Sequence, residues 1–441
     1  MRSRPYLLAG TALLTAGLAA APSLLTPSAS AGASKPTTVV TFWESHSAAN
    51  EQGHAIADIV RTFEHANPSI KVEIHVTPAS AKALAAVEAG DPPVMAMIGH
   101  APQYGYEKAG ALVNLKSFIY GKNGFLAAQL KGIWKGVWNA EFTPSHQQYL
   151  FPVDVKVAEF FYNAHIWHTA GPTKTPTTWA QLEADAAAIQ KRTGDIGLAV
   201  RMDHNDWIPQ LYSNGGSYMR SGSSTSLALD SPAMATTITQ LQHRDASLGV
   251  KVIAGYNTSL ADFGSGKIGV LENTADGYEM VREDVGGKFP VGVFGVPAGT
   301  TGKAYTLYQG LTFVIFSHAT KAEQQAAWTF IKYFDSPQGQ ATWSVVGGEP
   351  PISSADVPAV EKLAGSRWGA NPGPFAGTAV AVDELEQGTT IHKLIGPAQS
   401  EVDGVIQTEI QKVLQQGLSP KAAMKAMETQ GNAFLSGQAV A

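Results

Sequence analysis

Apolar residues near the start of the chain follow first a strand spacing and then a helical one. Residues 37–43 are β-branched and aromatic, which is typical of a buried strand. The apolar positions of residues 56–63 fall at i, i+3, i+4 and i+7 and predict one face of a helix, which an Asn-Pro pair at 67–68 ends. Residues 70–76 alternate apolar and polar side chains. The pattern therefore predicts a β-α-β unit that opens a parallel sheet.

Short apolar runs and amphipathic segments continue to alternate along the chain, which predicts an α/β fold. Thr178 has the residue type of a helix cap, as does Ser419 before Pro420. A long strand-like segment is expected at 155–163, and a helix is expected to start at Trp207. The further predicted strands are 94–98, 197–201, 268–273 and 311–316, and the further predicted helices include 80–89, 179–191, 232–248 and 327–334.

Length and charge limit the class of protein. With 441 residues, two domains are expected, and a charged fraction of only 15% with a net charge of −5 gives no basis for nucleic-acid binding. The absence of cysteine excludes disulfides, thiolate catalysis and thiolate metal sites. Residues 264–269 match GxGxxG but run into a predicted strand, so no nucleotide site is expected, and the common hydrolase and zinc motifs are missing. No catalytic residue, metal or cofactor is therefore predicted.

The first 31 residues have the pattern of a secretory signal peptide. Arg2 and Arg4 precede an apolar run that ends at Ala21, and the small residues at 29–31 offer a cleavage site near Ala31. No cysteine is available for a lipid anchor. We therefore expect an exported protein, periplasmic, secreted or associated with the cell surface, that is soluble after cleavage.

Polar and aromatic residues follow several of the predicted strands. In open α/β sheets, ligands bind beyond the carboxyl ends of the strands, so these residues are candidates for a ligand site. A mixture of aromatic, carboxylate, amide and cationic side chains suits a small polar ligand. Core packing, helix capping and plain turns are the alternative interpretations. The candidates from this pattern are Trp43, Glu44, His46, His100, Asn205, Asn273 and Asp276.

Several motifs together resemble the carbohydrate-type solute-binding proteins of ABC importers, the group that includes the maltose- and glycerol-3-phosphate-binding proteins. The likeness covers nearly the whole chain after the signal peptide and rests on the order and spacing of the motifs. They are residues 37–43, the helix end at 63–68, Phe160-Phe-Tyr-Asn163, Pro176-Thr-Thr-Trp179-Ala-Gln-Leu182, residues 263–269 and residues 330–352.

The resemblance implies a type II periplasmic-binding-protein fold. Its two lobes each contain a mostly parallel sheet flanked by helices, and a hinge joins them. By this analogy, residues 37–153 and 310–365 form the first lobe, and residues 154–309 and 366–441 form the second. The family closes around its ligand by hinge motion and presents a surface to the membrane permease.

The resemblance also adds candidate ligand contacts. Asp154 and Lys156 occupy the crossing segment that lines the cleft in the family, with a hinge ion pair as the alternative. Glycines allow close approach of a ligand, although a turn alone explains them. The relatives carry a phosphate-binding arginine near the C-terminal helix, where Lys393 offers only a point charge, so a neutral sugar is favoured. The residues added in this way are Asp154, Lys156, Trp207, Gly310, Gly348, Glu349 and Lys393.

The sequence thus predicts a monomeric solute-binding protein that captures a sugar or polyol and delivers it to the permease subunits of an ABC transporter. Glycerol-3-phosphate or a glycerophosphodiester is the alternative ligand for the same fold. A secreted glycoside hydrolase or lyase, with Glu44 and Asp276 as the carboxylate pair, is the alternative from another class. A surface adhesion or sensor module without transport also stays open.

Overall fold

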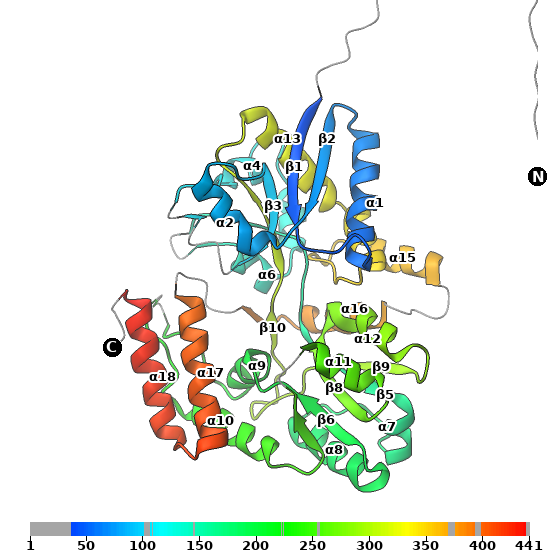
Figure 1. Cartoon of the computed structure of the whole chain (residues 1–441), viewed down its shortest axis with the longest axis vertical. Coiled ribbons are helices and arrows are strands. Elements are labelled where there is room, and N and C mark those ends of the chain that lie inside the picture. Colours follow the sequence, from blue (N-terminus) through cyan, green and yellow to red (C-terminus); the bar gives the residue numbers. More distant parts are fainter. Residues whose placement is uncertain are drawn as a thin grey trace, which may run out of the picture. The chain divides into compact units, whose positions relative to one another are not determined.

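The computed structural model of the protein contains two five-stranded sheets, each flanked by helices (Figure 1). This arrangement confirms the predicted α/β class. The structure describes residues 37–100, 106–107, 109–143, 146–221, 223, 225–253, 256–368, 375–392 and 398–437.

The first sheet has the order β2-β1-β3-β11-β4. Its strands β1, β2 and β3 are parallel neighbours, and β11 runs antiparallel to both β3 and β4. Only β11 therefore opposes the common direction, so the sheet is mostly parallel, as expected. The bounds are β1 Thr38–Glu44, β2 Ile70–Val76, β3 Met95–Gly99, β4 Phe151–Pro152 and β11 Leu311–Ile315.

The second sheet repeats this topology with the order β7-β6-β8-β5-β9. Here β5 is the strand that runs antiparallel to its two neighbours. A separate two-stranded parallel sheet pairs β10 with β12. The bounds are β5 Ala158–Asn163, β6 Ile196–Val200, β7 Val250–Val252, β8 Ile268–Thr274, β9 Val291–Gly295, β10 Thr306–Tyr308 and β12 Thr390–His392.

The helices fall into two groups along the chain. Those before β4 and after β11 are α1 Glu51–Ala66, α2 Ala79–Ala89, α4 Lys116–Ile119, α5 Ala127–Gly132, α6 Lys135–Ala140, α13 Lys321–Phe334, α14 Pro337–Gly347 and α15 Val357–Trp368. Those between β5 and β9 are α7 Ala164–Ala170, α8 Trp179–Thr193, α9 His204–Ser213, α10 Pro232–Asp245, α11 Tyr256–Gly264, the 3-10 turn η1 Ala275–Gly277 and α12 Tyr278–Val285. The last three are α16 Phe375–Glu386, α17 Gln399–Gln416 and α18 Pro420–Leu435.

Helix α1 illustrates how the hydrophobic pattern determines the packing. Its four apolar residues at helical spacing, from Ile56 to Phe63, are all buried in the core beside β1. Asn50 caps the helix by accepting a hydrogen bond from the backbone N–H of Gly53. The predicted caps Thr178 and Ser419 are likewise confirmed.

Several predicted boundaries were wrong by a few residues, and two of these lie near the predicted site. Helix α9 begins at His204, three residues earlier than expected, because the side chain of Asp203 caps it by accepting from the N–H of Asn205 at 2.8 Å. The strand expected at 155–163 is shorter, since β5 starts only at Ala158. The residues before β5 instead form a crossing segment between the sheets.

The chain crosses between the two five-stranded sheets in two neighbouring segments. One leads from β4 to β5 through Lys156, and the other leads from β10 to β11 through Gln309. Lys156 and Gln309 exchange two backbone hydrogen bonds of 2.7 and 2.8 Å. Side chains from both crossings are therefore held next to each other.

Aromatic side chains fill the core of the first sheet. Trp328 is 1% exposed and makes edge contacts with the rings of Phe125 and Phe151. Trp179, 6% exposed, lies in the core beside the second sheet. Both tryptophans thus have the core role expected from their helical stripes. Within the described residues, none of the helices combines the length and apolar character needed to span a membrane.

We expect Trp328→Ala to lower the free energy of unfolding by about 3–5 kcal/mol, because it removes buried aromatic surface and leaves a cavity. Leu126→Ala is the control, since Leu126 is 72% exposed and its substitution should change stability by less than about 0.5 kcal/mol. Urea unfolding of both variants measures the difference. Equal effects of the two substitutions would contradict this packing.

Candidate functional site

The ammonium group of Lys156 joins polar residues from both halves of the fold. Its Nζ donates to Oδ2 of Asp276 at 2.9 Å and lies 3.4 Å from Oε1 of Glu349. Asp276 follows β8 of the second sheet, and Glu349 follows α14, which packs against α1. We call Lys156, Asp276, Glu349 and the nearby Asp154 the Lys156 cluster.

Burial and charge act differently on the members of the Lys156 cluster. Burial opposes the charge of Lys156, but the carboxylates of Asp276, Glu349 and Asp154 outweigh it and raise the Lys156 pKa well above its usual value. Burial also opposes ionisation of Asp276, yet the ammonium of Lys156 lowers its pKa. For Glu349, burial dominates and raises the pKa well above its usual value. The positive charge of Lys156 therefore stabilises mainly the ionised form of Asp276, whereas Glu349 favours its protonated form.

Asp154 connects this cluster to the end of β1. It is fully buried, and its Oδ1 accepts from the backbone N–H of Leu311 at 2.6 Å. Burial raises the pKa of Asp154, while Lys156 and the imidazole of His46 act in the opposite direction. His46 in turn is held by Glu44, whose Oε2 lies 2.6 Å from the His46 backbone N and 3.1 Å from its Nδ1.

His100 lies on another side of Asp154. Its Nε2 is 2.9 Å from Oε1 of Glu141, and its ring packs edge-on against Tyr308. Burial lowers the pKa of His100, but Glu141 outweighs this effect, and the backbone of Gly310 and the charge of Asp154 add to the net rise. Gly310 fits here because an added Cβ would lie 2.5 Å from the carbonyl oxygen of Asp154.

Asn205 reaches the same region through Gln309. The side-chain amide of Gln309 donates to Oδ1 of Asn205, and its Oε1 lies 3.2 Å from Nε2 of His204. Because the Gln309 backbone pairs with Lys156, the start of α9 is tied to the crossing segments. Asn273, at the end of β8, is 1% exposed, and its Nδ2 has no hydrogen-bond partner.

Both tryptophans predicted to contact ligand lie against hydrophobic clusters. Trp207 is 1% exposed and stacks on Tyr218 at 5.6 Å, and Trp43 is half-buried against the cluster that contains Ile98. Both rings therefore pack against apolar side chains, the alternative role considered for residues at a strand end or helix start. Gly348 caps α14 in the left-handed conformation with φ 77°, next to Glu349. Lys393 lies outside the described residues.

Sequence reasoning missed Glu141 and Gln309. Glu141 is fully buried and holds His100, and its Oε2 lies 2.8 Å from Oγ1 of Thr312. It follows the short helix α6 rather than a strand, so the search for polar strand ends did not include it. Gln309 directly precedes Gly310, and only the pairing of the two crossings reveals its role.

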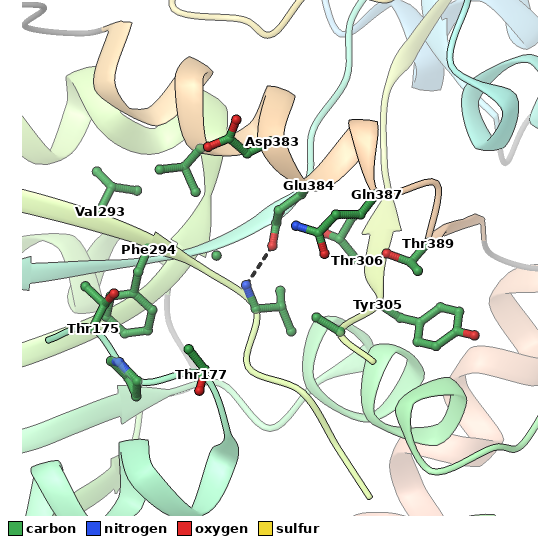
Figure 2. Close-up of a pocket in the computed structure, with 15 residues that line it drawn as sticks. Thr175, Thr177, Val293, Phe294, Tyr305, Thr306, Asp383, Glu384, Gln387 and Thr389 are labelled. Carbon is green, nitrogen blue, oxygen red and sulfur yellow. Dashed lines mark hydrogen bonds between the residues drawn. The ribbon is translucent and has the colours of Figure 1, made fainter. Parts of the chain in front are cut away.

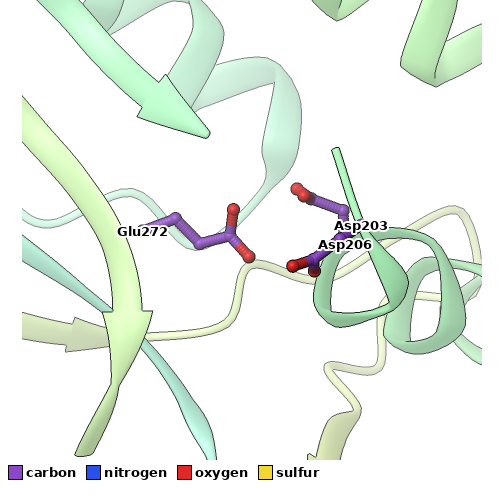
Figure 3. A group of neighbouring side chains, drawn as sticks. All are labelled: Asp203, Asp206 and Glu272. Atoms are coloured by element: carbon purple, nitrogen blue, oxygen red, sulfur yellow. The ribbon is translucent and has the colours of Figure 1, made fainter. Parts of the chain in front are cut away.

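Three carboxylates gather at the start of α9, as Figure 3 shows. One oxygen from each of Asp203, Asp206 and Glu272 lies within 4.8 Å of the others, a spacing that can hold a metal ion. Arginines already balance two of them, since Arg201 Nε lies 3.3 Å from Asp203 and Arg244 Nη1 lies 3.6 Å from Asp206. Burial and the neighbouring Asp206 raise the pKa of Glu272 well above its usual value. The two arginines and the raised pKa of Glu272 reduce the negative charge of this group, and we assign no metal to it.

A separate cavity of about 390 Å³ lies between β9 and α16 (Figure 2). Thr175, Phe294 and Tyr305 are among the residues that line it. Glu384 is 7% exposed and accepts a hydrogen bond from the backbone N–H of Val296 at 2.6 Å. Burial raises the pKa of Glu384 to about 8. At neutral pH this wall of the cavity therefore carries a protonated carboxyl group.

The raised pKa of Glu384 predicts a pH effect on stability. The folded protein retains a proton that the unfolded chain releases, so the free energy of unfolding falls as pH rises from the usual glutamate value to about 8. Glu384→Gln should reduce this slope by up to about 1.4 kcal/mol per pH unit. Urea unfolding across that range measures it, with the exposed Glu386→Gln as control. Parallel curves for wild type and Glu384→Gln would refute the prediction.

Replacing Lys156 tests the Lys156 cluster itself. Lys156→Met leaves buried carboxylates without their cation and should destabilise the protein by about 3 kcal/mol or more. Lys71→Met is a matched control, because Lys71 also forms a 2.9 Å pair, with Glu64, but is 54% exposed, so its loss should cost less than about 1 kcal/mol. Denaturant unfolding at neutral pH compares them. Equally small losses of stability in the two variants would mean that water screens the charges of the Lys156 cluster, and would contradict the prediction.

Comparisons with known proteins agree with this architecture. A structure of a cyclic α-maltosyl-1,6-maltose binding protein from Arthrobacter globiformis has 21% identity, covers 91% of this chain and 100% of that one, and gives a TM-score of 0.75. The sugar-binding protein MalE of Xanthomonas citri has 18% identity, 91% and 98% coverage, and a TM-score of 0.75. An ABC substrate-binding protein from Listeria monocytogenes in complex with cycloalternan has 19% identity, 91% and 100% coverage, and a TM-score of 0.73. A search of curated proteins found no match.

At these identities the structures establish the fold, which is that of two-lobed solute-binding proteins. The sequence establishes the family. A family model described as "Bacterial extracellular solute-binding protein" matches residues 58–369, most of the 441-residue chain. The chain belongs to the bacterial extracellular solute-binding proteins.

Proposed function

We propose that the protein captures a sugar or sugar-like polyol at the Lys156 cluster and delivers it to the permease of an ABC importer. The observation that carries this proposal is the meeting of Lys156, Asp276 and Glu349, which come from the crossing segment, the end of β8 and the end of α14. Family membership supports solute binding, and the names of the similar structures support a sugar.

Opening and closing of two lobes would give the solute access to this site. We propose residues 37–153 and 310–365 as the first lobe and residues 154–309 and 366–441 as the second. With these bounds the chain passes between the lobes three times, at 153–154, 309–310 and 365–366. The first two passages are the crossing segments, and the backbone pairing of Lys156 with Gln309 supports a site beside the hinge. After signal-peptide cleavage near Ala31, the protein would act outside the cytoplasm as a monomer.

The chemistry of the cluster suits a polyhydroxylated ligand. Asp276 Oδ1, Asp154 Oδ2 and Asn273 Nδ2 are buried polar atoms without a hydrogen-bond partner. A hydroxyl group both donates and accepts, so a sugar can satisfy carboxylates and amides together. The side chains of Lys156 and Asp276 remain 21% and 12% exposed, which leaves them reachable from solvent.

Binding without chemical change is the favoured activity. Glu44 and Asp276, the carboxylate pair considered for glycoside hydrolysis, are engaged separately, by His46 and by Lys156. The match to an extracellular solute-binding family also favours binding over hydrolysis. A phosphorylated ligand is also disfavoured, because its negative charge would face the carboxylates that surround Lys156.

A thermal-shift screen over mono-, di- and oligosaccharides, polyols and glycerophosphodiesters tests the proposal. A matched sugar should raise the melting temperature, because binding to the folded state alone adds about 2.7 kcal/mol at a concentration of 100 Kd. Asp276→Asn should weaken this sugar by about 1–3 kcal/mol in a calorimetric titration. Asp58→Asn is the control, since the Asp58 pair with Arg61 is exposed.

Turnover of a glycan that Glu44→Gln abolishes would replace binding with hydrolysis as the function. A sugar whose affinity is the same for wild type, Asp276→Asn and Asp58→Asn would place the ligand away from the Lys156 cluster. A glycerophosphodiester as the tightest ligand would favour the phosphorylated alternative.

A further inference from the structure

The Lys156 cluster contains more acid than base. Among the side chains that the structure describes, three carboxyl groups, those of Asp154, Asp276 and Glu349, act electrostatically on the ammonium of Lys156. Asp154 and Glu349 are fully buried, and Asp276 is 12% exposed at its side chain. Lys156 can pair closely with only part of this group, and burial favours the protonated form of Glu349 in the absence of a second cation.

The neighbouring histidines pair with other carboxylates, although the charge of His46 also acts on Asp154. His46 is paired with Glu44 at 3.1 Å, and His100 with Glu141 at 2.9 Å. Each histidine, when protonated, therefore offsets its own carboxylate. Glu159 adds a further buried carboxyl group that acts on Asp276 and on Glu384, and burial raises its pKa well above the usual value.

Unpaired hydrogen-bonding atoms of the carboxyl groups also indicate that a ligand group is needed here. Both carboxyl oxygens of Glu349, Oδ2 of Asp154 and Oδ1 of Asp276 are buried without a hydrogen-bond partner. Once ionised, carboxylates only accept hydrogen bonds, so a ligand that binds them in this form must donate several. An ammonium group donates three and also supplies the positive charge that favours the ionised form.

We propose that the solute carries a protonated amine, as in an amino sugar or an amine-bearing oligosaccharide, and that this amine binds among Asp154, Asp276 and Glu349 beside Lys156. The inference rests on the proposed function and names the ligand class of that same site. The rest of the sugar would use Asn205, Asn273 and the other polar groups of the region.

Before an amine binds, protons on the carboxyl groups reduce the negative charge of the site. Burial raises the pKa of both Glu349 and Asp154, which shifts these groups toward their protonated forms in the free protein. An arriving ammonium group stabilises the ionised carboxylates and expels those protons. A neutral sugar needs no such release. Proton release on binding therefore separates a charged ligand from a neutral one.

The experiment compares matched sugars by calorimetric titration at about pH 6.5, where a sugar amine is largely protonated. The probes are glucosamine and its β-1,4-linked oligomers up to the tetramer, their N-acetylated counterparts, and the glucose series of equal length. We expect an amine-bearing member to bind about tenfold or more tighter than its acetylated and neutral counterparts. Titration in two buffers of different ionisation enthalpy should show proton release with the amine series.

The same titrations with Glu349→Gln test the site. Removal of one negative charge at constant shape should reduce the preference for the amine by about tenfold, while substitution of an exposed carboxylate, Glu88→Gln, should leave it unchanged. Equal or tighter binding of a neutral sugar by the wild type would overturn the inference and leave sugar binding intact. Failure of every sugar in both series and in the broader thermal-shift screen would overturn the proposed function together with the inference.

Discussion

The ion pairs of Lys156 join the crossing segment to the residues that follow β8 and α14. One ammonium group lies 2.9 Å from Asp276 and 3.4 Å from Glu349, two carboxyl groups that follow different elements. Burial strengthens these interactions, because little water screens them, and it also makes any unpaired member costly. Binding of a polar ligand to this cluster would therefore change the relative stability of different arrangements of the surrounding elements.

The backbone explains why this lysine is in reach of both carboxyl groups. Each five-stranded sheet has the same strand order, and in each the antiparallel strand, β11 or β5, is entered from a crossing segment. The crossings pair through Lys156 and Gln309. A small change in backbone angles at such a pair moves whole elements, which is the property expected of a hinge. A ligand held there would act directly on the segments that move.

Much of the fold was predictable from the sequence because its elements bury one face. The stripe from Ile56 to Phe63 and the runs predicted at 37–43 and 268–273 correspond to α1, β1 and β8. Short segments such as β9 were not predicted, since five residues with two glycines carry little periodicity. The site was predictable only in part. Asp154 and Lys156 came from the family resemblance, while burial of Trp207 and the role of Glu141 depend on packing between distant segments.

Hydrogen–deuterium exchange with and without a sugar that raises the melting temperature tests the central claim most directly, because it reports where the ligand stabilises the backbone. The account predicts added protection of the amides at 154–157, 274–277 and 309–311, the crossings and the end of β8 that surround Lys156. Protection confined to the wall of the separate cavity near Val296 and Glu384, with unchanged exchange at the crossings, would contradict it.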